Sequence, residues 1–225
     1  MRNAILIAAA FCALPVHSRI LDFHSDIRVA TSGELTVTER ITLEVNARYP
    51  HSLLLRELST PSQVIDVIRN GHPESYTLDG SRLRIGRAPL AHGRHLYQIA
   101  YRSSRQVRFG DGLDELRWRV NENSFGVERV TAEVSLPAPV PARDIKVEAI
   151  GRDYESFVRD GRAAFRSKGE MTVVVRFPKG VVAEPGMAQR ARWYLDDYEG
   201  LLLVLIGLGL AALVLMRFRI LSARR

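Results

Sequence analysis

Cysteine is nearly missing from this sequence. Its single cysteine, Cys12, lies in an apolar N-terminal stretch that we expect to be removed from the mature chain. The mature protein then has no disulfide and no thiolate ligand, so packing alone must hold its fold together. A domain of about 160 residues is large enough to bury a core unaided.

The motifs of nucleophilic and phosphate-binding enzymes are also missing. The sequence contains no Gly-x-Ser-x-Gly element, no phosphate-binding glycine-rich loop and no cluster of cysteine and histidine. His92 and His95 are three residues apart, and on a strand they would point to opposite faces, which makes them a poor chelating pair. We therefore expect no catalytic residue, no metal site and no cofactor, and we do not interpret the chain as an enzyme.

A strong positive charge is lacking over the central region. The whole chain has a net charge of +7, but subtracting Arg2 and the four arginines of the C-terminus leaves +2 for residues 19–200. Proteins that bind DNA or RNA through the phosphate backbone carry a much larger basic patch. We therefore expect no nucleic-acid partner.

Helical periods are scarce between the two ends, where apolar and polar residues alternate. In ELTVTERITLEV one face is formed by Leu35, Val37, Ile41, Leu43 and Val45. This alternation is typical of a half-buried strand. Turn-forming pairs such as Asp-Gly recur between stretches of this kind. The pattern predicts an all-β fold, an antiparallel β-sandwich, over residues 19–182.

The stretch DGLDELRWRVNENS has two interpretations. Asp111, Asp114 and Glu115 beside an aromatic residue could form a cation site or an acid/base pair. Their spacing does not match a calcium loop, which needs oxygen ligands at fixed positions and a closing glutamate. Leu116 and Trp118 share one face of a period-two pattern. We therefore interpret the segment as a strand between two turns, with Trp118 in or near the core.

The N-terminus has the layout of a secretory signal peptide. Arg2 precedes an apolar run that ends near Val16, and Ser18 supplies a small residue before a cleavage site. Residues 1–18 are therefore interpreted as a signal peptide, and an uncleaved N-terminal anchor is the alternative. The signal peptide places the mature N-terminus outside the cytoplasm.

The C-terminal region is predicted to contain one membrane span. Residues 200–216 carry no charge, and as a helix they would be about 26 Å long, at the short end of a spanning segment. Residues 183–199 form a membrane-proximal linker before it. Residues 217–225 form a short basic tail after it.

The charges on either side of this span indicate its orientation. Arginines follow it without any acid, whereas Asp196, Asp197 and Glu199 precede it. The positive-inside rule then places the C-terminus in the cytoplasm. We predict a single-pass protein of the bacterial inner membrane whose partners include the lipid bilayer. The small residues Gly207 and Ala211 could bring two such helices together, which is a weak signal of dimerisation.

Glu39 interrupts the alternation of its strand, because it falls on the same face as Val37 and Ile41. A buried, unpaired carboxylate would cost several kcal/mol. A bulge could turn Glu39 outward, a twist could carry it to an edge, or a cation could meet it inside. Arg56 in LLLRELS is the candidate cation, since a guanidinium binds a carboxylate through two hydrogen bonds. We favour a structural ion pair between Glu39 and Arg56, and separate solvation of the two side chains is the alternative.

Four stretches together resemble a known bacterial family: SGELTVTERITLEV, HGRHLYQIAYR, FGDGLDELRWRVNENSFGVERVTAEVSLPAP and GEMTVVVRFPKGVV. They are similar, in order from residue 20 to 182, to predicted membrane proteins with an exported domain of unknown function, DUF2207. The resemblance implies an exported β domain ahead of membrane helices, with a Glu paired to an Arg downstream, and it implies no catalytic residue. Members usually continue into further membrane sequence, so we interpret this chain as a truncated form.

Three functions fit this reading. The first is a membrane-anchored extracytoplasmic β-sandwich that binds or scaffolds a protein partner in the cell envelope. The second is an envelope hydrolase or glycan-acting enzyme. The third is an accessory subunit of a larger membrane complex, which is compatible with the first. The strands, turns and lack of a nucleophile with its base favour the first.

Overall fold

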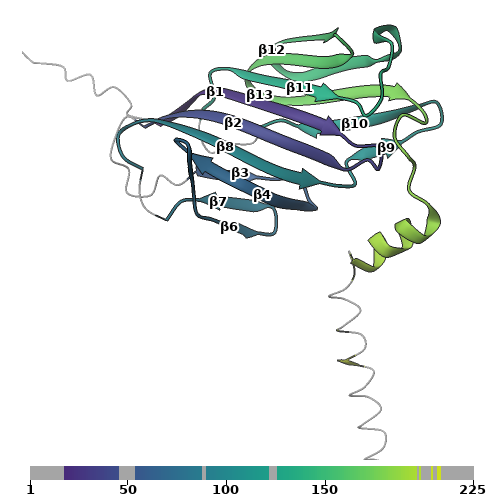
Figure 1. Ribbon diagram of the computed structural model, residues 1–225, viewed down its shortest axis with the longest axis horizontal. Coiled ribbons are helices and arrows are strands. Elements are labelled where there is room, and N and C mark those ends of the chain that lie inside the picture. The colour runs from purple at the N-terminus through teal and green to yellow at the C-terminus, as the bar shows by residue number, and fades with distance from the viewer. Residues whose placement is uncertain are drawn as a thin grey trace, which may run out of the picture. The chain divides into compact units, whose positions relative to one another are not determined.

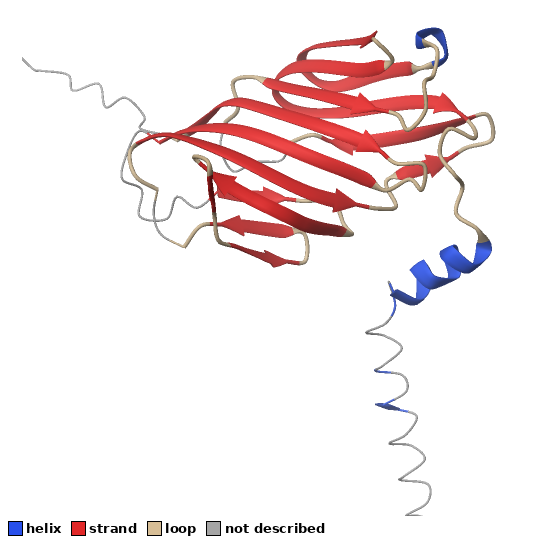
Figure 2. Ribbon diagram, in the orientation of Figure 1, coloured by secondary structure: helices blue, strands red, loops and turns tan. Residues whose placement is uncertain are grey.

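The computed structural model describes residues 18–45, 54–87, 90–121, 126–196, 198, 204, 207 and 208. These residues fall into two compact units, one ending at Ala183 and the other beginning at Glu184. The first unit contains all the described strands (Figure 1, Figure 2). The predicted signal peptide lies outside the described residues except for Ser18.

The described strands vary from two residues to seventeen in length. They are β1 (Arg19–Val29), β2 (Leu35–Val45), β3 (Leu54–Glu57), β4 (Ser62–Arg69), β5 (His72–Pro73), β6 (Tyr76–Asp79), β7 (Arg82–Ile85), β8 (Gly93–Ser103), β9 (Val107–Phe109), β10 (Leu113–Arg119), β11 (Val130–Ser135), β12 (Lys146–Arg159) and β13 (Arg162–Pro178). A 3-10 turn, η1 (Ala142–Asp144), precedes β12.

The strands form a large mixed sheet and a small sheet. The large sheet has the order β5-β4-β8-β2-β1-β11-β13-β10-β9, with β12 on β13, and the small sheet has the order β3-β7-β6. The predicted purely antiparallel pairing is wrong at one position, because β1 and β11 run parallel, with Phe23 opposite Val130. Alternation has the same period in both pairing directions, so it cannot reveal the direction of a partner strand.

The long strand β13 joins two parts of the large sheet. Its residues 162–167 pair with β11, its residues 172–178 pair with β10, and β12 pairs with both parts. The β12 register shifts next to Gly151 and again before Glu155. A bulged strand that changes partners along its length is how a sheet turns a corner.

The two parts of the sheet face each other across the core. Trp118 of β10 stacks on Tyr101 of β8 with ring centroids 6.4 Å apart, although the two strands are not neighbours in the sheet. Both side chains are buried. The prediction that Trp118 points into the core is therefore confirmed, and it follows from the alternation in β10.

Alternation also sets the core along β2. The predicted inward residues of this strand are all buried, and the intervening residues are partly or largely exposed. Successive side chains of a strand point to opposite faces, so one apolar face is enough to fix the strand against the core. Glu39 belongs to the inward series and is fully buried.

The C-terminal unit is described in part. Residues 187–196 are helical, within the segment that we predicted as a linker. Within the part of the chain that is described, no helix has both the length and the apolar character needed to cross a bilayer. The predicted span, residues 200–216, lies outside the described residues except for Val204, Gly207 and Leu208, and Ala211 lies outside them as well.

Candidate functional site

A buried ion pair joins β2 to β3 in the core. Arg56 donates from Nε to Glu39 Oε2 at 2.8 Å and from Nη2 to Glu39 Oε1 at 2.5 Å. Both side chains are at most 2% exposed. The structure thus pairs the two residues that the sequence placed together, in the two-bond geometry that suits a guanidinium and a carboxylate.

Three further groups surround this pair. The Tyr101 hydroxyl donates to Glu39 Oε1 at 2.7 Å, and Arg56 Nη2 donates to the Val120 carbonyl at 3.3 Å. The Arg56 guanidinium also lies 5.1 Å from the centroid of the Phe23 ring. A charge moved from water into the core loses hydration, and these contacts replace part of it.

Electrostatics keep the Arg56 guanidinium charged and the Tyr101 hydroxyl neutral. Burial alone would lower the pKa of Arg56, but the attraction of the Glu39 carboxylate and its hydrogen bonds raise the pKa above its ordinary value. Burial, together with the nearby Glu39 charge, raises the pKa of Tyr101 well above 10.0. Tyr101 therefore keeps its proton and donates it in the hydrogen bond to Glu39.

Sequence reasoning did not assign Tyr101 to this cluster. The residue lies on the inward face of β8, where Val37 is its cross-strand partner and Ile99 faces Glu39. Tyr101 is thus diagonal to Glu39, within reach of a long aromatic side chain. Its inward position was visible in the alternation of HLYQIAY, but its diagonal contact needed the register between β2 and β8.

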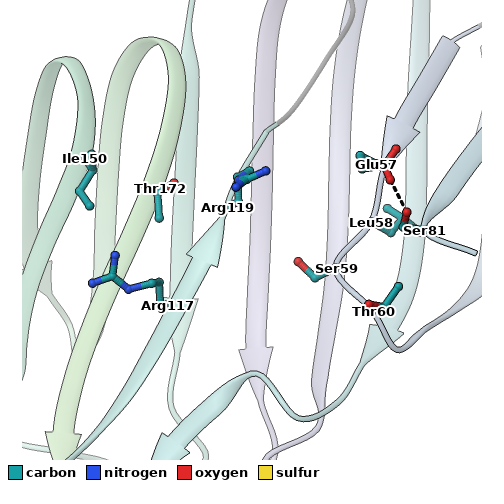
Figure 3. Close-up of a pocket in the computed structure, with 9 residues that line it drawn as sticks. All are labelled: Glu57, Leu58, Ser59, Thr60, Ser81, Arg117, Arg119, Ile150 and Thr172. Carbon is teal, nitrogen blue, oxygen red and sulfur yellow. Dashed lines mark hydrogen bonds between the residues drawn. The ribbon is translucent and has the colours of Figure 1, made fainter. Parts of the chain in front are cut away.

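An open cleft of about 530 Å³ is lined in part by Glu57, the residue that follows Arg56. Figure 3 shows its two sides, with side chains of β10, β13 and β12 opposite side chains from the end of β3, the segment after it and the β6–β7 turn. The first side is formed by Arg117, Arg119, Thr172 and Ile150, and the second by Glu57, Leu58, Ser59, Thr60 and Ser81.

Strand register builds the first side of the cleft. Arg119 of β10 faces Thr172 of β13, and Thr172 faces Ile150 of β12. The three side chains therefore form one row across three strands. Arg117 and Arg119 flank the inward-pointing Trp118, so the packing of the indole in the core directs both arginines to the cleft.

Backbone hydrogen bonds hold the second side. The Leu58 N–H donates to the Ser81 carbonyl at 2.8 Å, and Ser81 Oγ donates to Glu57. Gln106 Nε2 donates to the Thr60 carbonyl at 3.1 Å. Because Glu57 directly follows Arg56, the buried ion pair also fixes where this side begins.

The remaining candidates of the sequence are scattered. Asp114 and Glu115 lie within β10 and not in the turn before it, and Asp114 is buried with Lys179 Nζ 3.7 Å away. His95 is buried, with Nε2 2.8 Å from the Ala91 carbonyl, whereas His92 is exposed. Among the residues that the structure describes, no three His, Cys, Asp or Glu side chains cluster to hold a metal ion.

The described strands make residues 19–178 a predominantly β domain. Residues 19–185 match the family described as "Predicted membrane protein (DUF2207) N-terminal domain", and the chain belongs to this family. The resemblance seen in the sequence is therefore confirmed over nearly the same residues. A search among curated proteins finds no similar sequence.

Solved structures share part of the fold at low identity. Yeast LTA4 hydrolase in complex with bestatin is 13% identical, with a TM-score of 0.51 over 72% of this chain and 29% of that one. The M1 zinc metallopeptidase of Deinococcus radiodurans is 14% identical, with a TM-score of 0.46 over 81% of this chain and 53% of that one. This chain thus spans about half, or less, of those proteins, and the likeness to the yeast enzyme concerns the fold alone.

Proposed function

We propose that this chain is a membrane-anchored, extracytoplasmic β-sandwich that binds a protein partner in the cell envelope. Membership of a predicted membrane protein family supports the membrane location. The signal-like N-terminus and the apolar stretch before the final arginines support the orientation. A subunit of a larger membrane complex would bind its partner in the same way.

The cleft is the observation that carries the proposal. Its volume of about 530 Å³ lies within the range of ligand sites. One side presents the guanidinium groups of Arg117 and Arg119, and the other presents hydroxyl groups and the Glu57 carboxylate. A surface with both signs of charge and one exposed aliphatic side chain, Ile150, matches the chemistry of a peptide.

The partner is therefore proposed to be an extended polypeptide segment with an acidic side chain. That carboxylate would face Arg117 and Arg119, because guanidinium groups bind carboxylates through paired hydrogen bonds. Within the chain Arg117 contacts Glu115 at 3.5 Å, and half of the Arg117 side chain stays exposed. Serine and threonine hydroxyls across the cleft would meet the peptide backbone.

The experiment is site-specific photocrosslinking of the full chain in its own membranes. A photoreactive residue at Thr172 should give a protein adduct of defined mass. Arg117→Glu combined with Arg119→Glu should reduce that adduct at least about tenfold, since it replaces attraction by repulsion. The exposed residue Arg40 of β2 provides the matched control, and Arg40→Glu should leave the adduct unchanged.

The position of the photoreactive residue supplies the second control. Gln98 of β8 is exposed on the opposite side of its strand from buried Ile99, and it should not give the same adduct. If Gln98 and Thr172 capture the same proteins, or if the two arginine substitutions have no effect, the cleft is not the binding site.

A further inference from the structure

The strand β12 ends the sheet with an unpaired edge. It pairs with β13 along one side, and no other described strand pairs with it. Figure 1 shows β12 at the border of the strand assembly. At fourteen residues it is a long edge, and proteins normally shorten, charge or cover such edges because they recruit other strands.

Large apolar side chains lie on this edge strand. Ile150, Tyr154 and Phe157 are 51%, 49% and 44% exposed. Exposed aromatic and aliphatic residues on an unpaired strand favour pairing with another strand.

We propose that β12 pairs with β12 of a second copy of this chain, in antiparallel register around a two-fold axis between Asp153 and Tyr154. In this register Glu148 faces Arg159 of the other copy. Opposite charges on directly facing residues stabilise a strand pair. The symmetry produces this pair twice.

The apolar residues agree with the same register. Ile150 faces Phe157 of the other copy, and both are exposed in the single chain. Moving the register by two residues places Lys146 opposite Arg159 and Ile150 opposite Glu155. That alternative places like charges opposite each other and an aliphatic side chain opposite a carboxylate. The charges therefore favour the register with Glu148 opposite Arg159 over this alternative.

The geometry of β12 accommodates the two-fold axis. Its residues 146–151 and 155–159 pair regularly with β13, and the register shifts between them. The axis falls within the shifted segment, so residues 148–151 of one copy pair with residues 156–159 of the other. A two-fold axis perpendicular to the strands relates the bend in one copy to the bend in the other. The sheets of the two copies then join at their bends.

The charged groups of β12 are accessible for this pairing. Glu148 lies 3.4 Å from Arg176, and its side chain is 52% exposed. Arg159 lies 3.5 Å from Asp160 and is 81% exposed. Glu155 lies 3.7 Å from Arg166. Exposed contacts at these distances are weak, so the side chains can turn to a facing strand.

Charge reversal tests the proposal with the full chain in detergent micelles. Glu148→Arg and Arg159→Glu should each weaken dimerisation at least about tenfold, because each affects two symmetric pairs. The double variant should restore the dimer, since residue 148 then carries the positive charge and residue 159 of the facing strand carries the negative charge. Sedimentation velocity measures the protein mass. A chain that stays monomeric, or a double variant that is no better than the single ones, overturns the proposal.

Disulfide trapping tests the register. With Cys12→Ser as background, Ile150→Cys combined with Phe157→Cys should form a covalent dimer on mild oxidation. Ile150→Cys combined with Glu155→Cys belongs to the other register and should form much less. Equal trapping of both pairs overturns the proposed register. A dimer that persists through every charge reversal overturns the role of β12 and assigns association to another part of the chain.

Discussion

At the scale of single residues, Glu39 decides how β2 meets its neighbours. A carboxylate inside the core is tolerable only with its partners in place, and here Arg56 and Tyr101 satisfy it. A slip of β2 by one residue would turn Glu39 outward and leave Arg56 buried without a partner. The pair therefore selects one register, although its net contribution to stability is smaller than the cost of breaking it.

Breaking the pair should be far more costly than removing it. Glu39→Ala and Arg56→Ala should each reduce the free energy of unfolding by about 3 kcal/mol or more, because each leaves a buried charge without a partner. The double variant should cost much less than the sum. Denaturant unfolding followed by the fluorescence of Trp118, which stacks on Tyr101, provides the measurement. Small and additive effects would show that the two charges do not interact.

Glu115 should give stability a dependence on acid pH. Partial burial opposes its ionisation, but hydrogen bonds from Arg176 and Arg117 outweigh this and lower the pKa of Glu115 below 4.5. A lowered folded-state pKa stabilises the protein above the unfolded value, and the contribution is lost as the pH falls through the folded value. Glu115→Gln should therefore be less stable than the parent near neutral pH and equal to it in acid.

Unfolding midpoints measured from neutral to acid pH check this expectation. Glu133→Gln serves as the control, because its contact with Arg162 is exposed and 3.6 Å long, and such pairs contribute little. A constant difference between Glu115→Gln and the parent at all pH values would contradict the assignment.

At the scale of elements, the β12–β13 hairpin shapes the domain. It turns at Asp160 and Gly161, both with positive φ, as the Asp-Gly signal predicts. Near Gly151 it bends, and there the backbone of β13 passes so close that a Cβ would lie 2.8 Å from the Glu170 carbonyl. A glycine at this position lets one strand serve both parts of the sheet.

A methyl group at this bend should destabilise the fold. Gly151→Ala should cost about 1–3 kcal/mol, because the carbonyl of Glu170 cannot move without disturbing β13. Gly112→Ala is the matched control, since a Cβ at Gly112 meets nothing within 4 Å. Denaturant midpoints of the two variants give the comparison, and equal midpoints would mean that the hairpin relaxes freely at the bend.

At the scale of the whole molecule, the predicted orientation in the membrane depends on the two ends of the chain. The N-terminal apolar stretch and the C-terminal arginines predict the same orientation from independent physical causes. A reporter enzyme that is active only outside the cytoplasm should work when fused after Gly180 and fail when fused after Arg225. The opposite pattern of activity would reverse both the orientation and the proposed compartment.

The sequence by itself determined which residues point inward. Alternation is a local property, so the buried face of β2, the inward Trp118 and the need of Glu39 for a cation could all be inferred from neighbouring residues. The strand pairs themselves could not. The parallel pairing of β1 with β11 and the change of partners along β13 depend on contacts between distant segments.

Only the tertiary structure decided where the cleft forms. Its sides come from segments separated by many residues, and nothing in Glu57 or Arg119 alone indicates that they share a cavity. The role of Tyr101 likewise depends on its diagonal place beside Glu39. A period-two pattern sets the face of each side chain, whereas register and strand order set its neighbours, and these are fixed only when the whole core packs.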